Sequence, residues 1–584
     1  MSHLDTLITD HLDLWSAAVR PKSSAGRGSN SKLELTGIKK LRELILELAV
    51  RGKLVPQDPS DEPASVLLER IAAEKTRLVK EEGLRTSANE VVDIADEYIE
   101  CPSHWKWTRL GNIAKFIDYR GKTPNKIDAG VRLITAKNIR YGYIDLVPEE
   151  FISEADYDQW MTRGFPRVGD TLFTTEAPLG NAAVIDINER FALAQRAICF
   201  QWHYSTVSRF MLIQILASPF QNQLLDNSSG MTATGVKASR LKEIPVVIPP
   251  AEEQQRIVAK VDELMALCYQ LEQRSESQLV AHQTLVEALL TTLTDSGDAD
   301  ELAQNWARLS SHFDTLFTTE ASIDALKQTI LQLAVMGKLV PQDPSDEPAS
   351  ALLARIAAEK AQLVKEKKIK KEKPLPAINE DEKPFEIPQG WEFERIAVFG
   401  LVGTGATPSR SNPAYWEPAE INWISSGETA ELFVGKTKEQ ISNLAIKETN
   451  VSIYPAGTLI VAMYGQGKTR GQITELLEPA GTNQACSAIR LIDETKAHKD
   501  FVKLFFRKAY LELREHAAGG AQPNLNVGKI ASTVIPLPPI PEQHRIVAKV
   551  DELMTLCDQL KSRLQTSQQT QLALAESLVE GALS

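Results

Sequence analysis

The chain repeats one stretch of fourteen residues without a single change. GKLVPQDPSDEPAS occupies residues 52–65 and returns at residues 337–350. The similarity extends on both sides, so that residues 41–81 match residues 326–366. A repeat of this size means that one supersecondary unit is built twice and buries equivalent surfaces in both copies. Because 584 residues also exceed what one hydrophobic core organises, we expect at least two domains.

A second repeat follows at a similar distance. PPAEEQQRIVAKVDELMALCYQL (249–271) is matched by PPIPEQHRIVAKVDELMTLCDQL (538–560). The parts therefore run arm, block, helix and again arm, block, helix, and this cyclic order predicts two similar halves about an internal pseudo-two-fold axis.

The second repeat has the pattern of a long helix. Ile257, Val261, Leu264, Cys268 and Leu271 are spaced by alternating steps of four and three, which is typical of a coiled-coil seam. A double proline precedes each copy, where a helix can begin but cannot continue backwards. A helix of about 35 to 40 residues would span roughly 50 to 60 Å.

The fourteen-residue repeat itself predicts a corner between two helices. Its three prolines end a helix over 38–50, and Ser60 or Asp61 is expected to cap a second helix with Pro63 in its first turn. Two roles remain open. The corner is either purely structural or a docking surface, since Gln57 and Asp58 are kept in both copies.

The two blocks between the repeats have a sequence pattern typical of β-strands and turns, unlike the helical repeats. Short β-rich runs alternate with Gly, Pro and Asn turns, namely VRLITAKNI, DTLFTT and AICFQW in the first block and INWISS, GTLIVAMY and SAIRLI in the second. We expect an α+β protein in which two β-rich α/β domains are joined by long antiparallel coiled-coil-like helices. The predicted segments are a helical arm (1–100), a first domain (101–250), a central helical segment (251–385), a second domain (386–540) and a C-terminal helix (541–584).

Composition narrows the class of protein. The net charge is -12, but it is +3 over residues 101–250 and -1 over residues 386–540, so the acidity belongs to the connecting segments. The blocks therefore permit a local basic face. Five scattered cysteines without a CxxC pair, and nine histidines that do not cluster, predict free thiols and no zinc site. With no apolar run of membrane-spanning length and an acidic N-terminus, we expect a cytoplasmic protein.

Two motifs resemble catalytic signatures. AMYGQGKT (462–469) fits a loose phosphate-loop pattern, but the residues after it do not favour the helix that such a loop needs, so we expect a glycine-rich hairpin presenting Lys468 and Arg470. NPAY (412–415) resembles the NPPY corner of adenine methyltransferases, but Ala414 interrupts it. We therefore expect a non-catalytic chain that binds no cofactor and no metal.

The blocks are better suited to nucleic-acid contact. Their turn-rich segments carry basic groups, which neutralise phosphates, and amide side chains, which read base edges. Their recurrence at matching places in two divergent blocks favours this interpretation over chance. The run KEKKIKKEK (365–373) is interpreted as a solvated helix end that leads to a linker, with phosphate contact as the alternative. The candidate DNA-binding residues are Arg120, Lys122, Lys126, Lys137, Asn138, Arg140, Tyr141, Thr232, Thr234, Lys237, Ser409, Arg410, Asn412, Tyr415, Trp416, Lys468, Arg470, Gln522, Asn524 and Asn526.

The combination of repeats has a known counterpart. Two dissimilar blocks closing in IPPAEEQQRIVAKVDEL and LPPIPEQHRIVAKVDEL, with LAVRGKLVPQ and LAVMGKLVPQ, resemble the specificity subunits of type I restriction-modification systems, most of all the subgroup with a long N-terminal arm. The resemblance implies that each block is a target recognition domain for one half of a split, asymmetric sequence in double-stranded DNA. It further implies two methylase subunits that use S-adenosylmethionine, and restriction subunits that use ATP and Mg²⁺.

Two other classes of function stay open. A pseudo-symmetric scaffold without a DNA role has the same spacing of helices, and an NTPase depends on AMYGQGKT alone.

Overall fold

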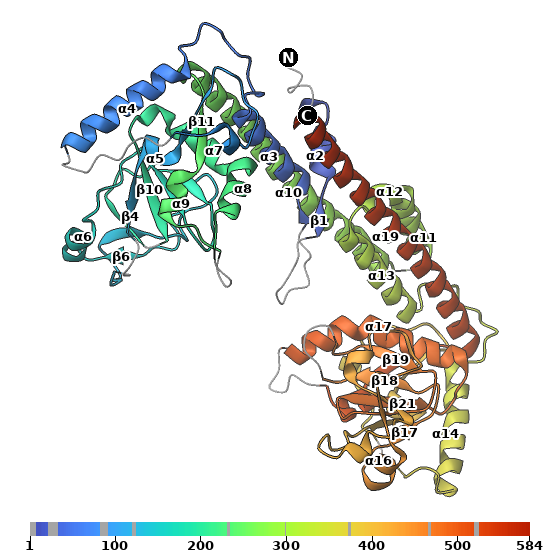
Figure 1. Cartoon of the computed structure of the whole chain (residues 1–584). Coiled ribbons are helices and arrows are strands. Elements are labelled where there is room, and N and C mark those ends of the chain that lie inside the picture. The colour runs from blue at the N-terminus through green and yellow to red at the C-terminus, as the bar shows by residue number, and fades with distance from the viewer. Residues whose placement is uncertain are drawn as a thin grey trace. The chain divides into compact units, whose positions relative to one another are not determined.

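The computed structural model describes residues 8–21, 33–81, 91–119, 124–194, 196–229, 234–297, 299–371, 375–464, 469–518 and 525–583. They form two compact units (Figure 1). Unit 1 holds the described residues up to 277 and those from 568 onward, and unit 2 holds residues 278–567.

Unit 1 combines helices with one β-rich domain. Its elements are α2 (Leu12–Ala17), β1 (Arg20–Pro21), β2 (Leu33–Glu34), α3 (Thr36–Val50), α4 (Ala64–Glu81), η1 (Ile94–Asp96), β3 (Lys106–Arg109), α5 (Leu110–Ile113), β4 (Ala114–Asp118), β5 (Val131–Ile134), β6 (Phe151–Ile152), α6 (Glu154–Trp160), β7 (Thr171–Thr174), β8 (Ala182–Val184), β9 (Phe191–Leu193), β10 (Ala197–Trp202), η2 (Ser205–Val207), α7 (Ser208–Leu216), α8 (Ser218–Asp226), α9 (Ala238–Glu243), β11 (Pro245–Ile248) and the first part of α10 (Ala251–Asp295).

The elements of unit 2 include counterparts of many of these and some additions. They are α11 (Ala299–Ser311), α12 (Phe313–Leu316), α13 (Glu320–Val335), α14 (Ala349–Lys365), η3 (Glu380–Glu382), β12 (Glu392–Arg395), α15 (Ile396–Phe399), β13 (Gly400–Thr404), η4 (Pro413–Tyr415), β14 (Ile421–Ile424), η5 (Ser426–Glu428), β15 (Phe433–Val434), β16 (Glu439–Ile441), α16 (Asn443–Glu448), β17 (Ile453–Tyr454), β18 (Leu459–Ala462), β19 (Ile473–Leu476), β20 (Ala480–Thr482), β21 (Cys486–Leu491), α17 (Lys496–Ala518), α18 (Val527–Ser532), β22 (Val534–Leu537) and most of α19 (Ile540–Leu583).

The β-rich domains of the two units share one strand plan. Unit 1 has sheets of order β4-β10-β7-β8, β6-β5-β9 and β11-β3, and unit 2 has β13-β21-β18-β19-β15, β16-β14-β20-β17 and β12-β22. One strand in each domain has one parallel and one antiparallel neighbour. Strand β5 lies between antiparallel β6 and parallel β9, and β14 lies between antiparallel β16 and parallel β20. The predicted pair of β-rich domains is therefore confirmed, and unit 2 adds β15 and β17 at the edges of its sheets.

The repeated helix is longer than its sequence pattern indicates. Helix α10 has 45 residues and α19 has 44. The seam is confirmed in both copies, because Ile257 and Cys268 in unit 1 and Ile546 and Cys557 in unit 2 are buried. Each long helix begins in one unit and ends in the other.

The fourteen-residue repeat forms the same corner in each unit. The Gln57 side chain donates to the Gly52 carbonyl at 2.8 Å, and Asp58 accepts from the backbone and hydroxyl of Ser60. Gln342 and Asp343 make the matching bonds in unit 2. The two polar side chains therefore satisfy the backbone of their own turn, and this favours the structural role of the corner over the docking role.

The expected cap of the following helix is wrong. Helix α4 begins at Ala64, after Pro63, and the carboxylate of Asp61 pairs instead with Arg256 of α10 at 2.6 Å. Asp346 makes the same pair with Arg545 of α19 at 2.7 Å. A tertiary partner far along the chain competes successfully for a side chain that local sequence assigns to a cap.

A buried tryptophan joins each β-rich domain to the start of its long helix. Trp105 Nε1 donates to Glu253 Oε2 at 3.0 Å, and Trp391 Nε1 donates to Glu542 Oε2 at 2.9 Å. Both glutamates are buried, and burial raises the pKa of Glu542. The joint fixes where each domain meets its helix.

The cysteines give a direct check of this packing. Cys199, Cys268, Cys486 and Cys557 are buried, whereas Cys101 is half-buried. Burial raises the pKa of Cys268 to about 11 and of Cys486 to about 12, and the thiolate is the reactive form. We expect a thiol reagent at pH 8 to label at most one of the five cysteines in the native chain and all of them after denaturation. Rapid labelling of two or more native thiols would contradict this packing.

Candidate nucleic-acid interface

In the β-rich domain of unit 1, three loops meet beside the end of β7. They contain Thr175 and Glu176 after β7, Arg196 between β9 and β10, and residues 234–236 before α9, and they are called the polar connections below. The backbone N–H of Thr175 donates to the Arg196 carbonyl at 2.9 Å, and that of Val236 donates to the Thr175 carbonyl at 3.1 Å. Arg196, with a positive φ of 72°, pairs with Glu176 at 2.7 Å. Thr234, an exposed candidate, precedes Gly235, which bridges to Glu176.

A fourth connection, residues 137–145, packs against the same β7–β8 loop. The backbone N–H of Gly142 donates to the Ala182 carbonyl at 2.9 Å, and the Asn181 amide donates to the Ile139 carbonyl at 3.0 Å. Lys137, Arg140 and Tyr141 are therefore brought near the three connections above, although sequence alone places them far apart.

Asn138 does not belong to an exposed interface. It is buried, its amide oxygen accepts from the Thr135 backbone at 3.0 Å and hydroxyl at 2.9 Å, and its amide nitrogen donates to the carbonyls of Asp145 and Pro148. In unit 2, Glu428 binds Ser425 in the equivalent turn. Since its hydrogen-bonding groups all serve the loop, Asn138 is removed from the candidates.

The neighbours of Asn138 are partly engaged. Arg140 pairs with Asp145 at 3.2 Å, and the Tyr141 hydroxyl donates to the Leu216 carbonyl while about half of its surface stays exposed. Burial raises the pKa of Tyr141 to about 12, so the hydroxyl remains protonated. Lys137 is exposed, as is Lys237 at the start of α9. Lys126 pairs with Glu150 at 2.7 Å.

In unit 2 the loops beside the end of β18, which correspond to those beside the end of β7, carry different side chains. The Thr407 hydroxyl donates to the Gln484 side chain at 2.6 Å, and the Ala485 carbonyl accepts from the Met463 backbone at 2.8 Å. Strands β18 and β19, on either side of AMYGQGKT, pair antiparallel. Residues 465–468 of this motif lie outside the described residues. Among the described residues after it, from Thr469 on, β19 and not a helix comes next, so the helix N-terminus that a phosphate loop needs is absent there, which favours the hairpin interpretation over nucleotide binding.

Arg410 is the centre of the second candidate group. Its guanidinium binds both oxygens of Glu439, at 2.5 and 2.9 Å, and lies 4.5 Å from the centre of the Trp416 ring. The ion pair raises the pKa of Arg410 and lowers that of Glu439. The Trp416 indole donates to the Ser409 carbonyl at 3.2 Å, which closes the loop beneath the guanidinium.

The remaining candidates of unit 2 have mixed environments. Asn412 accepts from the Ala414 backbone and stabilises its own turn, whereas the Tyr415 hydroxyl donates to Glu448 at the end of α16, 33 residues away. Asn526 caps α18, and Arg470 is half-buried. Six candidates lie outside the described residues, namely Arg120, Lys122, Thr232, Lys468, Gln522 and Asn524.

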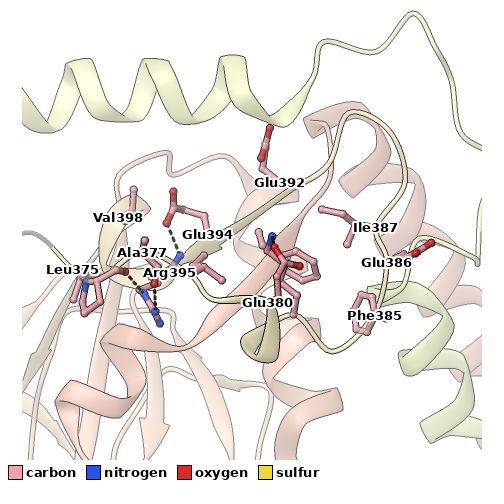
Figure 2. A pocket seen from close by; sticks show the side chains of 14 residues that line it. Leu375, Ala377, Glu380, Phe385, Glu386, Ile387, Glu392, Glu394, Arg395 and Val398 are labelled. Carbon is pink, nitrogen blue, oxygen red and sulfur yellow. Dashed lines mark hydrogen bonds and ion pairs between the residues drawn. The ribbon is translucent and has the colours of Figure 1, made fainter.

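A hollow of about 930 Å³ lies beside the segment that leads into the second β-rich domain (Figure 2). Residues of one segment, from Leu375 to Val398, line it. Arg395, the last residue of β12, fixes the start of this segment against the strand. Its guanidinium donates to the Pro376 carbonyl at 3.1 Å and to Glu382 at 2.9 Å. The hollow is therefore formed by residues 375–398 folding back on themselves, and its lining includes none of the candidate DNA-binding residues.

Sequence reasoning missed the acidic partners and one arginine of these loops. Glu150, Glu176 and Glu439 each hold a surface cation, and Arg196 joins two connections. One signal was available, because Gln195 and Gln484 occupy matching places in the two blocks and Arg196 is adjacent to the first.

Among the described residues, no group of three or more His, Cys, Asp or Glu side chains is placed to hold a metal ion. No helix within the described ranges is both long and apolar enough to span a membrane.

Comparisons with known proteins identify relatives of this chain. The family model "Type I restriction modification DNA specificity domain" matches residues 102–281 and 388–567. The chain is 40% identical to the type I restriction enzyme EcoEI specificity subunit and 39% identical to the EcoAI specificity subunit, both of Escherichia coli, over 100% of each chain. A crystal structure of the HsdS subunit from Thermoanaerobacter tengcongensis covers 84% of this chain and 99% of that one at 16% identity, with a TM-score of 0.41.

The matched ranges start at the proline before each domain tryptophan and end within each long helix. The family model thus recognises each β-rich domain together with its helix as one repeated module. With two such modules and whole-length relatives at 39% and 40% identity, this chain belongs to the family of type I restriction-modification specificity subunits.

Proposed function

We propose that this chain reads a bipartite, asymmetric sequence in double-stranded DNA, one half with each β-rich domain, and carries no catalysis of its own. The observation that carries the proposal is a shared strand plan with different side chains at equivalent loop positions. Glu176 and Arg196 in unit 1 correspond to Tyr464 and Ala485 in unit 2, because the same backbone hydrogen bonds hold both loops. Direct base reading depends on such side chains.

The proposal includes partner subunits that do the chemistry. We infer two methylase subunits, supplying S-adenosylmethionine and the adenine methylation, and restriction subunits using ATP and Mg²⁺. A duplicated surface on the long helices supports two copies of one partner. Lys260 pairs with Glu263 at 3.1 Å on α10, and Lys549 pairs with Glu552 at 2.9 Å at the matching place on α19. As a DNA-reading subunit, the chain is proposed to act in the cytoplasm.

The experiment that tests the function is a genome-wide map of methylated adenines in the host, with and without this gene. We expect a split, asymmetric methylated motif that disappears on deletion and returns when the gene is restored. A symmetric motif would contradict the two-reader proposal. An unchanged map in a host whose methylase subunits are expressed would favour the scaffold alternative.

A further inference from the structure

Both recognition domains carry a cation–carboxylate pair at the same place in the fold. Lys126 follows Pro124 by two residues, and Arg410 follows Pro408 by two residues. Each lies in the loop after the first strand of the larger sheet, which is β4 in unit 1 and β13 in unit 2. Lys126 Nζ lies 2.7 Å from Glu150, and Arg410 lies 2.5 Å from Glu439.

The two carboxylates are equivalent as well. Glu439 on β16 is in register with Trp423, the third residue of β14. Glu150 accepts at its carbonyl from the backbone of Leu133, the third residue of β5, at 2.7 Å. Because β5 and β14 hold the same position in their sheets, the cation and the acid are both matched between the domains.

The surroundings of the two pairs have diverged. Arg410 lies over Trp416, whose ring meets Trp423 edge-on at 5.3 Å. Lys126 has neighbours of another kind, since its loop carries Ile127, which bridges to Phe151. If the two domains read different DNA sequences, a feature that both retain, such as the cation–carboxylate pair, should contact a part of the DNA that both half-sites share. The two half-sites differ in bases and share the phosphate backbone.

Stability does not account for the Arg410 pair. Its two side chains are 60% and 38% exposed, and ion pairs with this exposure add little to folding. In the other pair Lys126 is 46% exposed and Glu150 is 17% exposed, so that pair also contributes to folding. The position of Arg410 in the fold favours a contact with a ligand instead. Thr407, three residues before Arg410, is hydrogen-bonded to Gln484, which is next to Ala485 in the turn that binds the end of the β18 segment at Met463.

We propose that Lys126 and Arg410 are phosphate contacts, and that Glu150 and Glu439 hold these cations in place until a DNA phosphate displaces the carboxylate. The inference rests on the proposed function. Carboxylate and phosphate present similar paired oxygens to a guanidinium, so the Arg410 fork can pass from one to the other. A contact of this kind sets the position of each domain on the duplex and carries no base preference.

The test measures DNA affinity of the full chain in complex with its methylase subunits over a range of salt concentrations, with a cognate and a scrambled duplex. We expect Arg410→Ala to weaken binding of both duplexes on the order of tenfold and to reduce the slope of log K against log salt by about 0.9. Glu439→Gln should strengthen binding, because it releases the cation. Lys126→Ala and Glu150→Gln should behave in the same way.

Arg190 provides a matched control. It pairs with Glu154, lies 5.3 Å from the centre of the Tyr157 ring and is as exposed as Arg410, but it lies between β8 and β9 and has no matched ion pair described in unit 2. Arg190→Ala and Glu154→Gln should leave affinity and salt slope unchanged. Melting temperatures of the Arg410, Glu439, Arg190 and Glu154 variants should match that of the wild type.

Several results would overturn the proposal. One is an unchanged affinity and salt slope for Arg410→Ala; another is weaker binding by Glu439→Gln, which would make the pair structural. A loss confined to the cognate duplex would make Arg410 a base reader. A wild-type complex that binds no DNA would refute the proposed function itself, whereas normal wild-type binding with neutral variants would refute this inference alone.

Discussion

Exchanging residues 101–250 for the corresponding block of another specificity subunit is expected to change one half of the methylated DNA sequence and to leave the other half and the spacer unchanged. The structure explains why the block can be exchanged. Its first and last strands, β3 and β11, pair in register from Lys106↔Ile248 to Arg109↔Pro245, so the chain enters and leaves the domain at one place. A separate core within residues 117–199 stabilises the domain.

The exchange has one structural requirement. Trp105 inside the block is bonded to Glu253 outside it, so the incoming block must bring a tryptophan at this position. The readout is the methylated-adenine map of a strain carrying the chimera. The reciprocal exchange of residues 386–540 is the control and should change only the other half-site. If either exchange altered both half-sites, the domains would not be independent readers.

Replacing Gly337 by alanine should strongly destabilise unit 2. Gly337 has a φ of +70°, and an added Cβ would lie 2.5 Å from Pro388 Cγ and 2.9 Å from the Trp391 ring. The left-handed backbone costs an alanine about 1 to 2 kcal/mol, and the overpacking adds about 1 to 3 kcal/mol. We expect a loss of roughly 2 to 5 kcal/mol in the free energy of unfolding, measured by urea denaturation.

The repeat supplies a second test site, and a helix supplies the control. Gly52 has a φ of +67° and would bring a Cβ to 2.5 Å from Pro102 Cγ, so Gly52→Ala should destabilise unit 1 in the same way. Gly581 lies in α19 with nothing within 4 Å of the built Cβ, and alanine there should be neutral or stabilise by up to about 1 kcal/mol. Equal effects at Gly337 and Gly581 would show that the corner tolerates the side chain.

These two glycines also explain why the fourteen-residue sequence is kept in both copies. The corner turns the chain from α3 or α13 in a left-handed conformation, and Pro102 or Pro388 packs against the bare glycine. Gln57 and Asp58 then bond to the turn itself. The glycine, the glutamine and the aspartate of the turn are thus constrained by its backbone geometry, and the same constraint applies in each unit.

Most of the fold could be predicted because its signals are local. A seam such as Ile257 to Leu271 repeats every few residues, and β-rich runs such as AICFQW are bounded by turn residues, so near neighbours along the chain determine helix and strand. The two errors of detail have one cause. Ser60 or Asp61 was expected to cap a helix and Asn138 to contact DNA, but Asp61 and Asn138 each have partners that local patterns do not reveal.

The sequence by itself determined the duplication, the cyclic order of the parts, the long helices and the two β-rich domains, because repeats and periodicities are written in consecutive residues. Only the tertiary structure decided which polar side chains face outward and which are engaged. Arg410 meets Glu439 across 29 residues of sequence, and Trp105 meets Glu253 across 148. Such pairs form when folding brings distant strands and helices together, and their electrostatic and hydrogen-bond energies depend on a proximity that no local pattern encodes.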